Sequence, residues 1–149
     1  MKIIFTVASL APETGGPART VSALSSSLAD LGIGAEIITL DAGTVFGSPL
    51  MPANKKVETV FVPCWHSRRL PVPAFGRKLQ RDCVRADACL IHDNGVWLAT
   101  NHAAARIARG QKKTLVLSPR GMLTKWSLRY RNWKKTWPCM HTSAATLRQ

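Results

Sequence analysis

The stretch that decides the fold is Thr14-Gly15-Gly16-Pro17-Ala18-Arg19-Thr20, because it joins a strand pattern to a helix pattern. Before it, residues 2–8 (KIIFTVA) are apolar and rich in β-branched side chains, which is typical of a buried strand. After it, apolar residues recur with the spacing of one face of an amphipathic helix, at Val21, Leu24, Leu28 and Leu31. The sequence therefore predicts a strand, a glycine turn and a helix over residues 17–31.

Two adjacent glycines, Gly15 and Gly16, lie on this predicted turn. Glycine lets a ligand approach bare N–H groups, and the helix N-terminus behind it offers free donors and a partial positive charge. This favours a phosphate-binding turn, although a tight strand-to-helix connection without a ligand fits the same residues. A nicotinamide-cofactor site is disfavoured because G-x-G-x-x-G is absent; only Asp41, after the second strand, matches the acid of that site.

Beyond residue 31 the alternation of strand and helix patterns continues. We predict further strands over residues 35–40, 57–62, 88–91 and 114–117, and further helices over residues 75–86, 96–109 and 122–135. The order β-α-β-β-α-β-α-β-α is typical of an α/β domain, a doubly wound Rossmann-like parallel sheet. Ligands bind such sheets beyond the carboxyl ends of the strands. The exit loops 92–95 and 118–121 should therefore join the glycine turn at that edge.

Charge narrows the class of partner. The chain has 149 residues, one domain's worth, and a net charge of +13. Eleven basic residues and no acid follow Asp93. A half-chain of this kind is typical of a protein that meets a polyanion, such as nucleic acid, an anionic membrane or a phosphorylated substrate.

Cysteine spacing and hydropathy exclude other classes. The four cysteines (Cys64, Cys83, Cys89 and Cys139) show no C-x-x-C spacing and no clustering with histidine. We therefore predict reduced thiols of a cytosolic protein, with Cys89 packed in a strand, and no metal site. The apolar start of the chain runs into a turn and a helix, unlike a signal peptide. No stretch approaches the roughly 18 apolar residues of a membrane span.

Four stretches together carry a resemblance to one enzyme family. They are residues 15–19 (GGPAR), 91–97 (IHDNGVW), 101–105 (NHAAA) and 118–123 (SPRGML). In this order they resemble the N-terminal half of bacterial family-four glycosyltransferases. Those are retaining enzymes of the B-type fold, in which two Rossmann-like domains face each other across a cleft, and they build lipopolysaccharide, exopolysaccharide and capsule. The resemblance covers residues 1–135, which we expect to form the N-terminal, acceptor-side domain.

The resemblance implies a role for individual residues. It implies a donor-phosphate site at Gly15, Gly16 and Arg120, whose guanidinium suits a phosphate rather than proton transfer. It implies an acceptor side made by His92, Asn94, Gly95 and Trp97.

Each acceptor-side assignment has a competing interpretation or a limit. Many relatives carry a second histidine where this chain has Asn94, which can hydrogen-bond a sugar hydroxyl but cannot carry a proton. A buried histidine satisfied by its own loop remains an alternative for His92, and helix packing remains one for Trp97.

The implied activity is transfer of a sugar from a nucleotide-sugar to a lipid-linked or polysaccharide acceptor, with no cofactor. The family's second domain, which carries the base and ribose pocket, has no counterpart in this sequence, and residues 136–149 depart from the family pattern. We therefore expect an N-terminal fragment or the product of a truncated gene, inactive by itself. A separate donor-binding domain would then be a partner.

Basic, tryptophan-bearing segments predict a place at the cytoplasmic face of a membrane. Residues 64–85 and 120–135 each hold six basic residues, with at most one acid. Tryptophan among Lys and Arg is typical of an interfacial helix. The predicted membrane-facing residues are Trp126, Arg129, Arg131, Trp133, Lys134 and Lys135.

Two alternatives to the membrane interpretation stay open. Inward packing of the tryptophans fits the same residues. The charge also fits a basic nucleic-acid-binding module, although no helix-turn-helix, zinc-finger or RNA-binding signature occurs, so no specific nucleic acid is expected.

Overall fold

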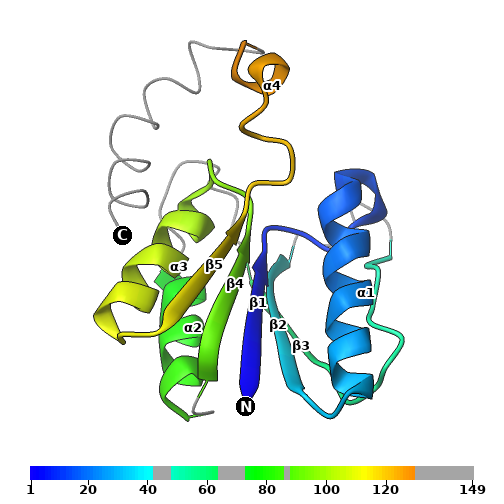
Figure 1. The fold of residues 1–149 in the computed structure, drawn as a ribbon, viewed down its shortest axis with the longest axis vertical. Coiled ribbons are helices and arrows are strands. Elements are labelled where there is room, and N and C mark those ends of the chain that lie inside the picture. Colours follow the sequence, from blue (N-terminus) through cyan, green and yellow to red (C-terminus); the bar gives the residue numbers. More distant parts are fainter. Residues whose placement is uncertain (42–47, 64–72, 86–87, 130–149) are drawn as a thin grey trace.

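The computed structural model describes residues 1–41, 48–63, 73–85 and 88–129. A parallel sheet forms its centre, with helices on both faces (Figure 1). The strands are β1 (Lys2–Val7), β2 (Gly34–Asp41), β3 (Glu58–Pro63), β4 (Ala88–Asn94) and β5 (Thr114–Ser118). The helices are the short 3-10 turn η1 (Pro12–Thr14), α1 (Gly16–Asp30), α2 (Pro73–Arg85), α3 (Ala99–Gly110) and α4 (Lys125–Arg129).

The strands lie in the order β3-β2-β1-β4-β5, and every neighbouring pair is parallel. The chain first moves outward from β1 to β2 and β3, and then returns to place β4 on the other side of β1. The α1 helix covers one face of the sheet, and α2 and α3 cover the other (Figure 1). This confirms the predicted doubly wound, Rossmann-like α/β fold.

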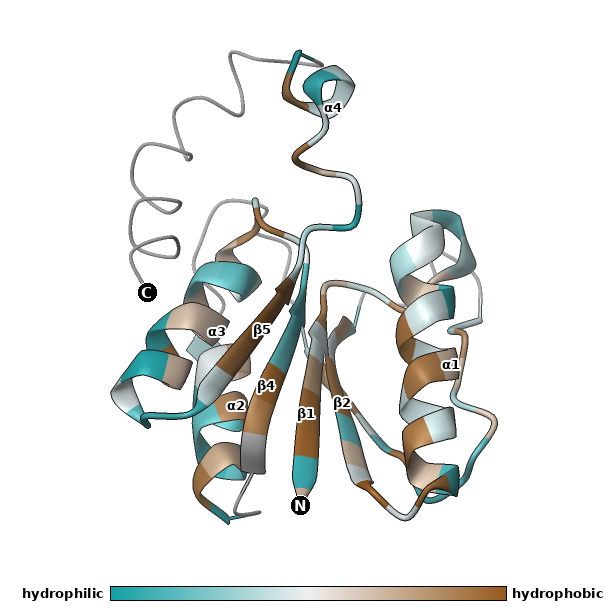
Figure 2. Ribbon diagram, in the orientation of Figure 1, coloured by the Kyte–Doolittle hydropathy of each residue, from teal (hydrophilic) through white to brown (hydrophobic). Residues whose placement is uncertain are grey.

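Two apolar layers hold the helices to the sheet. On the α1 face, Phe5, Leu10, Val21 and Ile37 belong to one buried cluster. On the other face, Ile4, Ile38, Phe75, Leu79 and Ile91 belong to a second. Because successive residues of a strand point to opposite faces, β1 supplies both clusters in alternation. Figure 2 shows the strands coloured mainly as hydrophobic, with the hydrophobic residues of α1 turned toward the sheet.

Helix and strand types agree with the sequence prediction, but three boundaries around the site do not. Residues 92–94 were expected in an exit loop, whereas β4 continues through Asn94, since its residues 92–94 pair with residues 5–7 of β1. The following helix begins at Ala99 rather than at residue 96, so Trp97 precedes it. The last predicted helix begins at Lys125 rather than at residue 122, and its residues 130–135 lie outside the described part of the chain.

A buried charge network lies between β2 and α2. Glu36 of β2 is 1% exposed, and its carboxylate lies 2.6 Å from Lys2 Nζ and 3.5 Å from Lys78 Nζ. Lys78 also lies 2.5 Å from the carboxylate of Asp82, one helical turn further along α2. Burial is the largest effect on Glu36 and raises its pKa. The network therefore links α2 to the sheet. Burying the carboxylates costs free energy, and the two lysines offset that cost.

Candidate functional site

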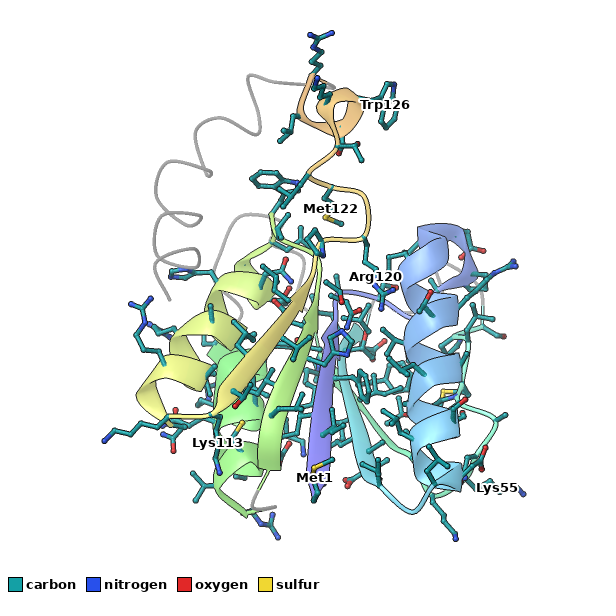
Figure 3. All side chains as sticks on the ribbon, in the orientation of Figure 1. Met1, Lys55, Lys113, Arg120, Met122 and Trp126 are labelled. Atoms are coloured by element: carbon teal, nitrogen blue, oxygen red, sulfur yellow. The ribbon has the colours of Figure 1, made fainter. Side chains whose placement is uncertain are left out.

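The candidate site lies at the carboxyl ends of β1, β4 and β5. Between β1 and β4 the chain reverses the direction in which it adds strands, which is the position where open α/β sheets bind ligands. The loop that leaves β5 passes over these strand ends and carries Arg120 and Met122 (Figure 3).

Arg120 is the central cation of this edge. Its Nε and Nη2 both donate to Asn94 Oδ1, at 2.9 and 2.6 Å. The side chain is partly buried, and its backbone has φ = 52°, a left-handed value that is uncommon outside glycine. Among the described residues, no carboxylate forms an ion pair with it. The structure therefore holds a guanidinium here by a neutral amide.

Asn94 is fully engaged by the protein. It is 3% exposed, and its Nδ2 donates to the backbone oxygens of Thr6 and His92, each at 3.2 Å. Its amide orientation is consistent with both sets of partners, because the nitrogen faces two carbonyls and the oxygen faces Arg120. Asn94 thus supports another side chain, and its predicted contact with a sugar hydroxyl stays a prediction.

His92 lies beside Asn94 on the α1 face of the sheet. Its Nε2 lies 2.7 Å from Ser118 Oγ, and its ring lies 5.2 Å from that of Phe5. Burial is the main cause, and the nearby Arg120 the second, of a pKa below the usual value for histidine. His92 is therefore neutral at physiological pH and can exchange hydrogen bonds with a ligand without adding charge.

Asp93 points to the opposite face and braces the site from behind. It is 1% exposed, accepts a 2.6 Å bond from Thr6 Oγ1, and accepts two 3.0 Å bonds from Asn101 Nδ2. Asn101 Oδ1 in turn accepts from Leu98 N at the start of α3. Burial raises the pKa of Asp93 to about 6, despite the hydrogen bonds that lower it.

The glycine turn reaches the same edge of the sheet. Gly15 has φ = 81° and ψ = −139°, a conformation that favours glycine, and its N–H donates to Pro12 O at 3.1 Å. Gly16 is exposed and begins α1, and a Cβ added there would meet nothing within 4 Å. No hydrogen bond within the described residues uses the N–H groups of Gly16 or Ala18. Of these two residues Gly16 is exposed, so its N–H can meet a ligand as the phosphate-binding interpretation requires, whereas Ala18 is buried.

Gly95 and Trp97 follow β4. Gly95 is buried with φ = 117°, its N–H donates to Ser118 O at 2.9 Å, and an added Cβ would lie 3.3 Å from Asn101 Oδ1. Its conformation thus explains the glycine. Trp97 is half-buried, and its Nε1 is buried without a hydrogen-bond partner among the residues that the structure describes. Their predicted acceptor-side roles remain predictions.

The structure brings together Asn94, Arg120 and His92, as the exit-loop argument predicts. Sequence reasoning missed three supporting residues: Thr6, Asn101 and Ser118. The last two lie within the motifs at 101–105 and 118–123, but a motif does not say which of its side chains faces which. Strand pairing does, because it sets Asn94 opposite Val7 on one side and Ser118 on the other.

The structure describes two of the six predicted membrane-facing residues. Trp126 is 73% exposed and points away from the sheet (Figure 3), and Arg129 is exposed at the end of α4. This argues against inward packing for that tryptophan. The other four, Arg131, Trp133, Lys134 and Lys135, lie outside the described residues. None of the described helices is long and apolar enough to span a membrane.

The structure describes only two of the four cysteines on which the thiol and metal predictions rest. Cys83 is a free, buried thiol with a pKa raised to about 11 by burial. Cys89 belongs to β4, whereas Cys64 and Cys139 lie outside the described residues. Within the described ranges, no three His, Cys, Asp or Glu side chains gather as metal ligands would.

Comparison with known proteins identifies the fold. No protein-family model matches the chain, and no curated protein matches it in sequence. Similar solved structures include a protein assigned as a UDP-N-acetylglucosamine 2-epimerase from Listeria monocytogenes, with a TM-score of 0.61 at 12% identity. The UDP-GlcNAc 2-epimerase of Methanocaldococcus jannaschii has a TM-score of 0.56 at 14% identity. That of Neisseria meningitidis, bound to UDP-GlcNAc, has a TM-score of 0.55 at 13% identity.

These matches cover nearly the whole of this chain but a minor part of the others. They span 97–98% of the chain, and 36%, 38% and 39% of the three epimerase structures. At such low identity the likeness shows the fold alone. It agrees with a Rossmann-like domain that corresponds to one half of a protein with the B-type glycosyltransferase architecture.

Proposed function

We propose that this chain is the acceptor-side half of a nucleotide-sugar enzyme, namely a retaining glycosyltransferase that acts in cell-surface polysaccharide synthesis. The donor would be a nucleotide-sugar, and the acceptor a lipid-linked or polysaccharide saccharide. The residues 15–19, 91–97, 101–105 and 118–123, which resemble family-four enzymes, support the transferase assignment. The fold shared with UDP-GlcNAc 2-epimerases supports the broader class of nucleotide-sugar enzymes.

One observation carries the proposal: an unpaired cation lies at the ligand-binding edge of the sheet. Arg120 is held over the ends of β1 and β4 by Asn94 and has no carboxylate partner among the described residues. The N–H of the exposed Gly16, which has no hydrogen-bond partner in the described part of the chain, lies at the start of α1, and this N-terminus follows the end of β1. Cation and helix N-terminus both favour an anion such as a diphosphate.

In this proposal the chain's residues stabilise the leaving diphosphate. Negative charge develops on that group as the bond to the sugar breaks, so fixed donors aimed at it lower the barrier. The Gly16 N–H, the first turn of α1 and Arg120 are the donors that this chain supplies. His92, neutral and beside Arg120, is placed to hydrogen-bond a sugar hydroxyl. None of these groups is a nucleophile, and the base and ribose pocket would come from a second domain.

Nucleotide-sugar binding is the first test. Amide NMR of the 149-residue protein, titrated with UDP-GlcNAc, should show the largest shifts at residues 15–20 and at Arg120. Gly16→Val should weaken this binding by about tenfold or more, because the new side chain fills the space that a phosphate needs. Gly110→Val is the matched control, since a Cβ there also meets nothing within 4 Å. Equal affinity of the Gly16 variant and wild type would refute the phosphate role.

Transfer itself needs the complete donor site, so the chain by itself should be inactive. Purified protein incubated with nucleotide-sugars and a lipid-linked acceptor should release no nucleoside diphosphate above the rate of a Gly16→Val control. Sugar transfer at about 1 s⁻¹, an ordinary rate for an enzyme, would contradict the need for a second domain. Conversion of UDP-GlcNAc to its 2-epimer, without any acceptor, would instead favour an epimerase.

Membrane attachment is the second part of the proposal. Four exposed or partly exposed positions on or before α4 combine apolar and basic character: Leu123, Lys125, Trp126 and Arg129. A lipid-linked acceptor would make a place at the inner face of the cell membrane useful. Tryptophan anchors at the headgroup level, and each basic residue near anionic lipid contributes about 1 kcal/mol.

A further inference from the structure

The support beneath Arg120 is unusual because it is neutral. Buried or partly buried arginines are commonly paired with carboxylates. Here both contacts, from Nε and Nη2, go to the single amide oxygen Asn94 Oδ1. The neighbouring carboxylate, Asp93, faces the other side of the sheet, where Thr6 and Asn101 occupy it. The positive charge of Arg120 is therefore oriented without being cancelled.

The way Asn94 grips the guanidinium leaves its far end open. A guanidinium has five N–H donors, and Asn94 takes two of them. The remaining three, two on Nη1 and one on Nη2, point away from the amide, and no residue in the described part of the chain accepts from them. Two parallel donors at that end match two oxygens of a phosphate.

The loop that carries Arg120 is itself fixed. Ser118 O accepts from Gly95 N at 2.9 Å, and Pro119 O accepts from Met122 N at 2.9 Å. Arg120 and Gly121 both have positive φ, 52° and 77°. A non-glycine residue in this conformation is strained and persists only where its surroundings hold it. The geometry of Arg120 is thus set from both the backbone and the side chain.

We propose that Asn94 is a positioning residue that presents Arg120 as an uncancelled cation to a multiply charged phosphate or diphosphate group. The inference rests on the proposed function and adds to it a reason for asparagine at this position. A carboxylate in place of the amide would grip the guanidinium in the same way but would neutralise it. An apolar residue would leave the guanidinium free to move. Only a neutral acceptor both orients the cation and keeps its charge for the ligand.

The test compares three substitutions in the full 149-residue protein. Asn94→Asp keeps the shape and adds the neutralising charge; Asn94→Ala removes the grip; Arg120→Gln removes the cation. Gln80→Glu, at an exposed position on α2, is the control for a change of one charge unit far from the site. The probes are inorganic pyrophosphate and UDP-GlcNAc, measured by titration calorimetry. The Arg120 Nε–H resonance reports its hydrogen bond to residue 94, and thermal unfolding reports whether the variant is folded.

The proposal expects a distinct result from each variant. Asn94→Asp should keep the Nε–H signal and lose about tenfold or more in pyrophosphate affinity. It should also lose some stability, because a carboxylate oxygen replaces the Nδ2 donor that faces the Thr6 and His92 carbonyls, so its affinity is read only where thermal unfolding shows it folded. Asn94→Ala should lose the Nε–H signal and pyrophosphate affinity together. Neither Asn94 variant should bind pyrophosphate more weakly than Arg120→Gln does. Gln80→Glu should bind as wild type. Wild-type affinity in Asn94→Asp, with the fold intact, would overturn the inference.

The two probes separate this inference from the proposed function. If pyrophosphate binds and Asn94→Asp weakens it, the inference stands, even if UDP-GlcNAc binds no more tightly than pyrophosphate. That second result would count against the nucleotide-sugar assignment only. If UDP-GlcNAc binds with Gly16-dependent affinity and Asn94→Asp leaves it unchanged, the proposed function stands and the inference fails.

Discussion

Thr6 Oγ1 donates a 2.6 Å hydrogen bond to Asp93 Oδ1, and this bond joins β1 to β4 directly below the candidate site. Both residues are nearly fully buried, at 0% and 1% exposure. The two oxygens of Asp93 also hold Asn101 and, through it, the start of α3. One carboxylate thus fixes two strands and a helix behind Arg120, although it does not face the ligand edge.

Asp93 should make stability fall as pH rises through the weakly acidic range. Burial raises its folded pKa to about 6 from an ordinary 3.8, so the folded protein holds this proton more tightly than the unfolded chain. Between these two values the free energy of unfolding should decrease with pH, by roughly 3 kcal/mol in all, and the loss is complete above pH 6. Chemical denaturation of wild type and Asp93→Asn at several pH values measures this, and the variant should lack the decrease.

The Asp93→Asn comparison concerns the pH dependence, not the absolute stability, because the amide cannot reproduce every hydrogen bond of the carboxylate. Thr6→Val offers an independent check. Loss of the Thr6 hydroxyl removes a bond that lowers the pKa of Asp93, so the upper end of the window should move to higher pH. Identical pH profiles in wild type and both variants would show that Asp93 does not titrate there.

Gly95→Ala should destabilise the protein. Gly95 has φ = 117°, and an added Cβ would lie 3.3 Å from Asn101 Oδ1 and 3.4 Å from its Nδ2. Backbone strain of this kind costs about 1–3 kcal/mol, and the crowding acts on the side chain that holds Asp93. Gly110→Ala is the control, because its φ is not positive and its added Cβ meets nothing within 4 Å. Urea denaturation should show a loss for the first variant only.

Lys78→Ala should cost on the order of 3 kcal/mol of unfolding free energy. Lys78 lies between two buried carboxylates, those of Glu36 and Asp82. Its removal leaves them facing each other, with Lys2 as the remaining ion-pair partner of Glu36 among the described residues. The neighbouring Arg77→Ala removes the same charge from an exposed position and should change stability by less than about 0.5 kcal/mol. Equal stability of the two variants would mean that the network adds nothing to folding.

Anionic vesicles should bind the protein through the segment that begins at α4. Co-sedimentation should increase with anionic lipid and decrease with salt, because the attraction is electrostatic. It should weaken when four basic residues, Arg129, Arg131, Lys134 and Lys135, are all changed to Gln. The control changes four other exposed basic residues, Lys55, Lys56, Arg106 and Lys112, by the same charge. Equal co-sedimentation of the two variants with anionic vesicles would count against this membrane site, and so would tighter binding to DNA than to vesicles.

Strand and helix types could be predicted from the sequence because β1 and the helix after it carry clean apolar periodicity. The end of β4 could not, since His92, Asp93 and Asn94 are polar and resemble a loop. They are strand residues because they pair with residues 5–7, far away in the chain. Local pattern does not report such pairing, and tertiary context overrides it.

The sequence predicted where the site lies in the fold, but not which side chains contact one another there. Asn94 ends β4 and Arg120 follows the neighbouring parallel strand β5, which was enough to bring them to one edge of the sheet. The direction of each side chain was not available, because a shift of one residue in a strand moves a side chain to the other face. This is why Asp93 and Asn94, adjacent in sequence, serve opposite faces.

The central position of β1 has a consequence for how the chain is made. This strand is synthesised before the other four described strands of the sheet, yet Thr6 pairs beside Asp93, a residue synthesised 87 positions later. At about 5–20 residues per second, the nascent chain waits roughly 4–17 seconds for its fourth strand. Through that interval one edge of an apolar strand stays without its partner, and open strand edges invite aggregation. Slowed translation before residue 88 should therefore lower the yield of native protein.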